Sequence, residues 1–248
     1  MIRIALVLAC LVAAEHRAHA IAACGNGEGW SLAPGATLPV HPRLVYYVDL
    51  RMQASQSGAS IKATIDGASV PAKLTFRKAS PYELAVVEVE SDKPGKLVLE
   101  WGKATAAASF WHGANATYTL AKRTLPAVAN ATTSRFHRAY HHTSVHESDD
   151  GLAVRVDVPA IAFTARWRRD DKQDWQTLEL TAVTIDGHQV ARLGELGCSS
   201  NFTVAILEQG IDLELDALLP DGSTRKVRGL PRHVVLPPLP KDAPRSSP

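Results

Sequence analysis

Cysteine, methionine and long apolar runs are scarce in this sequence. Three cysteines occur in 248 residues, and the formal net charge is only +2. After the first twenty residues no segment is apolar enough to cross a bilayer as a helix, which needs about 20 such residues. Lys and Arg are nowhere concentrated with interleaved aromatic residues, so nucleic acid is not an implied partner. We therefore expect a chain with no transmembrane segment and no nucleic-acid partner.

The first twenty residues have the pattern of a secretory signal peptide. Arg3 provides a positive start, residues 4–14 form a short apolar run, and Ala18-His19-Ala20 is an A-x-A cleavage signal. We interpret residues 1–20 as a signal peptide, so the protein is expected to be exported to the periplasm or the extracellular space.

Two cysteines would be left after cleavage, and we predict that Cys24 and Cys198 form a disulfide, as is common in exported proteins. Such a bond would constrain the unfolded chain by about 5 kcal/mol in the loop-entropy description. Ile21-Ala22-Ala23-Cys24 also has the form of a bacterial lipobox. The alternative is therefore a lipoprotein anchored at Cys24, which would place Glu15, His16 and Arg17 in the membrane-inserted segment.

A repeated sequence motif suggests two domains. Thr64-Ile65-Asp66-Gly67 recurs as Thr184-Ile185-Asp186-Gly187, at an offset of domain size, and a second echo relates residues 95–99 to residues 210–214. We interpret this as a duplicated unit. The predicted organisation is a first domain over 21–124, a second over 125–230, and a Pro-rich disordered tail over 231–248.

The hydrophobic pattern is that of strands. Ile61, Ala63 and Ile65 alternate with polar residues, as do Leu152, Val154, Val156 and Val158, and Asp-Gly and Pro-Gly turns separate such segments. Short strands so spaced favour a sandwich or a barrel. We predict an all-β fold of two tandem immunoglobulin-like (fibronectin-like) β-sandwich domains. For residues 201–209 we prefer a strand to a short helix, because Phe202, Thr203, Val204 and Ile206 are poor helix formers.

The main candidate site is a histidine-rich segment, consisting of His137, His141, His142 and His146. Neutral imidazoles at these spacings can bind Zn²⁺ or Cu²⁺, although the surrounding Thr and Ser residues indicate a solvated loop. The sequence contains no Gly-x-Ser-x-Gly elbow, no His-Glu-x-x-His motif and no Cys-His motif. We therefore expect no catalytic residues and no cofactor.

Residues 31–45 (SLAPGATLPVHPRLV) resemble the opening of bacterial exported immunoglobulin-like domains, and more distantly that of the periplasmic copper-resistance CopC family. The CopC resemblance would imply copper binding. Met52 is the only methionine beyond the signal peptide, however, which excludes a methionine-rich copper(I) site. We expect an exported, non-enzymatic binding or structural protein of the cell envelope, whose partner is an unknown protein or envelope component. The alternative is a periplasmic copper- or zinc-binding protein that uses the histidine segment.

The N-terminus of the exported chain gives a direct test. We expect the N-terminal peptide to begin at Ile21, and the intact mass before reduction to be lower by two hydrogens because Cys24 is bonded to Cys198. Mass spectrometry with and without reductant measures both. An acylated peptide that begins at Cys24 would instead establish the lipoprotein.

Overall fold

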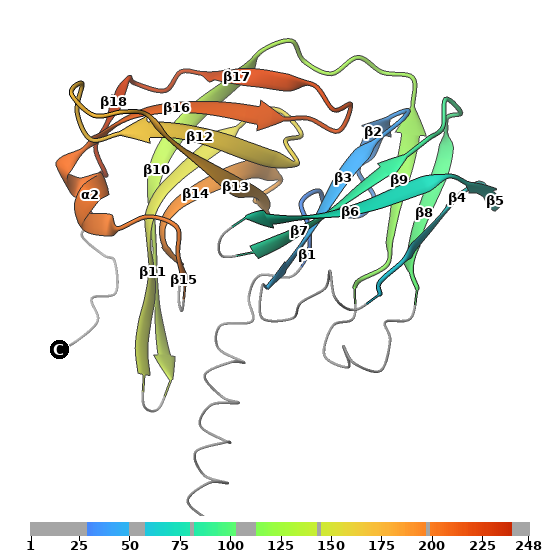
Figure 1. Ribbon diagram of the computed structural model, residues 1–248, viewed down its shortest axis with the longest axis horizontal. Helices are drawn as coiled ribbons and strands as arrows, with labels where there is room; N and C mark the ends of the chain where they lie inside the picture. Colours follow the sequence, from blue (N-terminus) through green and yellow to red (C-terminus); the bar gives the residue numbers. More distant parts are fainter. Residues whose placement is uncertain are drawn as a thin grey trace, which may run out of the picture.

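The computed structural model describes residues 29–49, 58–79, 82–102, 113–142, 145–196 and 199–239; side chains at 49, 78–79, 82, 138–142, 145–148 and 199 are not described. The described chain is all-β apart from one short helix, which confirms the all-β prediction. It forms two units, an N-terminal pair of sheets and a C-terminal barrel (Figure 1).

The N-terminal unit consists of two sheets around one apolar core. The first sheet has the order β1-β3-β7-β6, with β1 Gly29–Trp30, β3 Arg43–Asp49, β7 Tyr82–Val89 and β6 Ala72–Ala79. The second has the order β2-β9-β8-β4-β5, with β2 Thr37–Pro39, β9 Ala116–Ala121, β8 Gly95–Trp101, β4 Ile61–Ile65 and β5 Ala68–Val70. Leu44 from the first sheet and Leu97 and Tyr118 from the second are fully buried in the same cluster.

The C-terminal unit is a ring of seven strands. The order is β11-β10-β17-β16-β12-β13-β14, and β14 pairs again with β11. The bounds are β10 Ala129–His142, β11 Val145–Val156, β12 Ala162–Arg168, β13 Gln176–Ile185, β14 His188–Leu196, β16 Ile211–Leu218 and β17 Thr224–Arg228. Two short strands, β15 Ser199–Ser200 and β18 His233–Val234, pair with β14 and β16 respectively.

This ring shows that the predicted pair of tandem immunoglobulin-like sandwiches is wrong. β11 pairs with β10 on one side and with β14 on the other, so the second half closes on itself instead of splitting into two sheets. Inward residues such as Leu152, Phe163 and Leu215 are almost fully buried. The two-residue alternation that predicted these strands is the same in a sandwich and in a barrel. The sequence pattern therefore could not distinguish the two.

The two Asp-Gly corners also occupy unrelated places. Asp66-Gly67 joins β4 to the edge strand β5, whereas Asp186-Gly187 joins β13 to β14 inside the barrel wall. Both pairs have positive φ at both residues, 49° and 83° in the first corner and 50° and 75° in the second. This is the backbone that a two-residue hairpin turn requires. The repeat therefore reflects local turn chemistry, and the architecture does not support a duplicated unit.

The closing seam of the barrel contains a pair of facing glycines. Gly151 of β11 and Gly194 of β14 are register partners. A Cβ at Gly151 would lie 2.1 Å from the carbonyl oxygen of Leu193, and one at Gly194 would lie 2.2 Å from that of Asp150. Only glycine lets the two strands approach this closely, so the pair is a condition for closure.

A helix and the start of the tail cover one end of the barrel. Residues Val204–Gln209 form helix α2 and not the preferred strand; the helix ends at Gly210, which has a φ of 92°, and buries Leu207. The predicted disorder of the tail does not extend to residues 233–239. There β18 pairs with β16, Leu236 is buried, and its backbone N–H donates to the Leu207 carbonyl at 2.8 Å. We call residues 230–239 the strap; the rest of the tail lies outside the described residues.

The two units contact each other directly. The Thr184 hydroxyl donates to the Ser31 carbonyl at 3.1 Å, and the Arg43 N–H donates to the Pro220 carbonyl at 2.6 Å. Ile161, from the chain that leads into β12, is buried in the core of the N-terminal unit. Polar and apolar contacts thus join the N-terminal unit to the barrel.

The glycine seam leads to a stability prediction. We expect Gly151→Ala and Gly194→Ala each to destabilise the fold by about 1–3 kcal/mol, because the added methyl must push a backbone carbonyl aside. Gly29→Ala is the matched strand control: among the described residues its Cβ would meet only the Tyr47 hydroxyl, at an ordinary 3.9 Å, and we expect a change within about 0.5 kcal/mol. Denaturant unfolding measures all three, and equal effects at the three positions would contradict the close approach.

Candidate functional site at the base of the β10–β11 hairpin

The longest hairpin of the described chain projects beyond the barrel (Figure 1). β11 pairs with β14 only over residues 149–156, whereas it pairs with β10 over residues 145–156. Residues 139–142 and 145–148 therefore have only each other as strand partners in the described chain. We call this two-stranded extension the arm.

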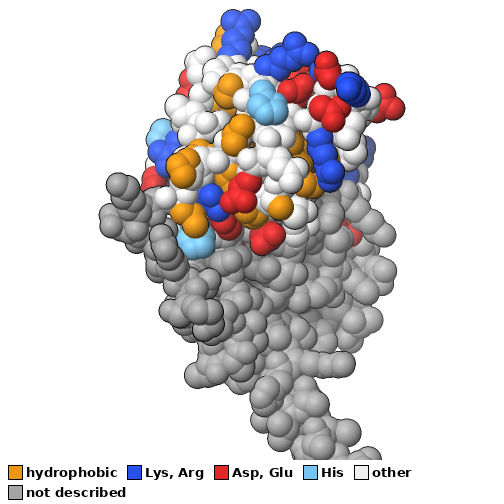
Figure 2. Space-filling view, turned by 90° about the vertical axis from the view of Figure 1, so that its left-hand side faces the viewer, with side chains coloured by type: hydrophobic (Ala, Val, Ile, Leu, Met, Phe, Trp, Pro, Cys, Tyr) orange, Lys and Arg blue, Asp and Glu red, His pale blue; other side chains and the backbone are white. Residues whose placement is uncertain are grey.

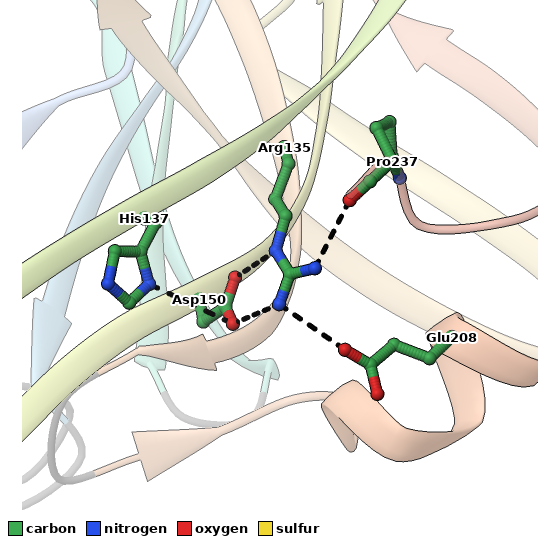
Figure 3. A network of polar contacts seen from close by, with 5 residues as sticks. All are labelled: Arg135, His137, Asp150, Glu208 and Pro237. Carbon is green, nitrogen blue, oxygen red and sulfur yellow. Dashed lines mark hydrogen bonds and ion pairs between the residues drawn. The ribbon is translucent and has the colours of Figure 1, made fainter. Parts of the chain in front are cut away.

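A buried ion pair lies where the arm leaves the barrel. Arg135 of β10 contacts both carboxylate oxygens of Asp150 on β11, with Nε 2.8 Å from Oδ1 and Nη2 2.6 Å from Oδ2 (Figure 3). Arg135 is directly opposite Leu152, a core residue, and directly opposite residues share a face of the sheet. The ion pair therefore closes one end of the apolar interior.

The same guanidinium connects two further segments. Nη1 of Arg135 donates to the Pro237 carbonyl of the strap at 3.1 Å, and Nη2 lies 3.4 Å from Oε1 of Glu208 on α2. Figure 3 shows these groups converging on the guanidinium from different elements. Arg135 thus joins β10, β11, α2 and the strap at a single point.

Burial and pairing set the electrostatics of this network. The side chain of Arg135 is 7% exposed and that of Asp150 is 12% exposed. The hydrogen bond to Asp150 raises the pKa of Arg135 further above its ordinary value, against the opposing effect of burial. Both oxygens of Asp150 accept hydrogen bonds from the guanidinium. The arrangement is suited to holding four segments together, because the carboxylate is engaged on both oxygens.

Of the four predicted metal-ligating histidines, only His137 has a described side chain. His137 lies in the barrel wall, 12% exposed, with Nδ1 3.8 Å from Oδ2 of Asp150. His141, His142 and His146 lie in the arm, where their side chains are outside the described part. The register nevertheless pairs His141 with His146, and His142 with Val145. The segment is therefore a strand pair and not the expected solvated loop.

No group of three or more metal-ligating side chains is found among the residues whose side chains are described. Cys24 and Cys198 also lie outside the described residues, so the predicted disulfide stays a prediction. The same holds for the signal peptide over residues 1–20.

A second polar cluster lies on the outer wall of the barrel. Arg168 of β12 pairs with Asp212 of β16 at 3.0 Å, and Nδ1 of His233 on β18 lies 3.3 Å from the other oxygen of Asp212. Burial alone would raise the pKa of Asp212, but the hydrogen bonds from His233 and Arg168 outweigh it and lower this pKa. The guanidinium of Arg168 also lies 4.9 Å from the ring centre of Trp175.

Acidic and basic side chains are mixed along the described part of the face in Figure 2. Ion pairs of the outer wall also include Arg166 with Glu214 at 3.2 Å and Lys226 with the same carboxylate at 3.7 Å. We interpret Arg168 and Asp212, whose side chains are 12% and 13% exposed, as a largely buried ion pair on the outer wall, and Arg166 and Glu214 as an exposed one.

Sequence reasoning missed the network at the base of the arm. None of Arg135, Asp150 and Glu208 was singled out as a candidate site residue from the sequence. Their separations along the chain, 15 residues between Arg135 and Asp150 and 73 between Arg135 and Glu208, follow no motif. A single Arg and Asp at these positions carried no signal without the strand register.

Within the described residues, no helix is both long and apolar enough to cross a membrane. No family model matches the chain, and no curated protein matches it.

Three of the solved structures that match this chain are distantly similar to it. A type I pullulanase from Bacillus subtilis strain 168 in complex with maltose aligns at 6% identity and a TM-score of 0.24, covering 79% of this chain and 24% of the enzyme. A maltotriose-bound pullulanase from Anoxybacillus sp. LM18-11 aligns at 9% identity and 0.25, covering 79% and 25%. The tandem Ig repeats of Dlar align at 11% identity and 0.21, covering 81% and 96%. The chain spans about a quarter of the two pullulanases. These TM-scores are too low to assign a fold or a function.

The ion pair at the base of the arm predicts an asymmetry between two arginines. Arg135→Ala leaves Asp150 buried without its cation and should cost about 3–5 kcal/mol of unfolding free energy. Arg166→Ala removes an exposed pair, with side chains 47% and 37% exposed, and should cost about 0–1 kcal/mol. The double variant Arg135→Met, Asp150→Leu should recover much of the loss. Denaturant unfolding compares them, and equal costs for the two single variants would contradict the assignment.

Proposed function

We propose that this protein is an exported, non-enzymatic binding module of the cell envelope that contacts its partner through the arm. The observation that carries the proposal is that residues 139–142 and 145–148 continue beyond the barrel as a two-stranded ribbon, paired only within itself in the described chain. The location follows from the predicted signal peptide at residues 1–20 and from the resemblance of residues 31–45 to exported domains.

The physics of such a ribbon favours an interaction role. Ordering a residue in a strand costs about 1–2 kcal/mol of backbone entropy, and an isolated two-stranded hairpin is marginally stable in water. The arm sequence from Ala139 to Ser148 is mostly polar, so it offers little apolar surface for burial. We therefore expect the cost of ordering the arm to be offset by binding to another molecule. An exposed strand edge can pair with an extended segment of such a partner.

The base of the arm is built to hold it rigidly. Arg135 and Asp150 fix β10 against β11 directly below the arm, and Arg135 also contacts α2 and the strap. A rigid mount reduces the ordering cost that binding would otherwise incur. Because the carboxylate of Asp150 is engaged by the guanidinium, this network supports a positioning role rather than proton transfer.

Site-specific photocrosslinking in the producing cell tests the proposal. A photoreactive residue at Tyr140 or Glu147 in the arm should give the same discrete adduct, identified by mass spectrometry. Thr177, exposed on β13, is the matched control and should give none. Replacing residues 139–148 by Asn-Gly keeps Arg138 opposite Asp149 and removes the arm. The purified full chain should then compete for the adduct, while the arm-deleted chain should not.

Adducts of equal yield at Thr177, or competition by the arm-deleted chain, would contradict the role of the arm. The unfolding midpoint of the arm-deleted chain should match that of the parent, because the barrel core is unchanged. That measurement separates loss of the arm from loss of the fold.

A further inference from the structure

We propose that His141 and His146 form a two-imidazole binding site for a divalent transition-metal ion, Cu²⁺ or Zn²⁺, across the arm. The two residues are direct register partners on β10 and β11. The inference rests on the arm being formed as in the proposed function, and it adds metal binding to the role of the arm.

The register supplies the geometry that a chelating pair needs. Directly opposite residues in an antiparallel pair have Cα atoms about 4.5–5.5 Å apart and lie on the same face. Two imidazole nitrogens on one ion at about 2.0–2.1 Å are separated by roughly 3 Å. Two histidines opposite each other on a ribbon are thus close enough to share an ion. The ribbon also holds them at less entropic cost than a flexible loop would.

The same register removes the other two histidines from the site. His142 is paired with Val145, one position along, so the alternation of a strand places it on the opposite face from His141. His137 is four residues from His141, about 14 Å along the strand. It faces Asp150, whose two oxygens are already held by Arg135. The predicted set of four ligands is therefore narrowed to a pair.

A site with two protein ligands leaves the remaining coordination positions of the ion open. Water can fill them, or a donor group from a partner that contacts the arm. Imidazole is a good ligand for both Zn²⁺ and Cu²⁺, and at equal ligands Cu²⁺ binds more tightly. We therefore expect an exchangeable ion with a preference for Cu²⁺ over Zn²⁺, in contrast to a closed structural zinc site.

Metal titration of the tag-free full chain tests the pair. ZnCl₂ and CuCl₂ are each titrated in competition with a chromophoric chelator, and one ion per chain is expected. His141→Ala and His146→Ala should each weaken binding at least tenfold. His142→Ala is the matched control and should change it less than twofold, as should His137→Ala. With Cu²⁺, electron paramagnetic resonance should show two coupled imidazole nitrogens in the parent. It should show one in His141→Ala and one in His146→Ala.

Two results would overturn the site. One is that the parent chain does not bind one ion per chain. The other is that His142→Ala loses as much metal affinity as His141→Ala, which would indicate a flexible histidine segment. Circular dichroism and the unfolding midpoint verify that the variants are folded. Repeating the photocrosslinking in a chelator distinguishes the two proposals. An adduct that persists while the titration is negative leaves the arm function standing and removes the metal site. If metal binding depends on His141 and His146 but no adduct forms, the metal site stands and the proposed binding function of the arm is removed.

Discussion

The pairing of β11 with β14 is the constraint on which the C-terminal unit depends. Without it, the seven strands would be an open sheet with two unpaired edges, and the inward row that includes Leu152 and Leu193 would face water. Closure brings the two backbones into contact at Gly151 and Gly194, where no larger residue fits. Asp150 precedes Gly151 directly, so the same contact also sets the position of the carboxylate that holds Arg135.

The Arg135–Asp150 pair has a cost as well as a benefit. Moving both charges out of water is expensive, so the pair is weak evidence for net stability. Its benefit is that one planar guanidinium fixes the relative positions of β10, β11, α2 and the strap. An apolar side chain at this position could fill the space but could not specify the direction in which each segment leaves the barrel.

The sequence predicted the strands whose one face is buried, and it failed where that signal is missing. Leu152, Val154 and Val156 alternate because their side chains fill the barrel, so the strand was evident. The part of β10 that contains His137, His141 and His142 was predicted to be a solvated loop, because Thr and Ser residues follow it and the segment has no regular apolar alternation. Ring closure and the Arg135 network could not be predicted, since both depend on contacts between residues that are distant along the chain.

The strap has a consequence for how the molecule can be joined to others. Because the Pro237 carbonyl is held by Arg135 at the foot of the arm, any polypeptide that continues from residue 239 starts beside the projecting hairpin. A carrier, fluorescent protein or surface anchor fused directly after residue 239 would therefore begin near the base of the hairpin. The sheets of the N-terminal unit lie on the side of the barrel opposite to α2 and the strap (Figure 1). Attachment at that unit would keep the fused partner away from the base of the hairpin.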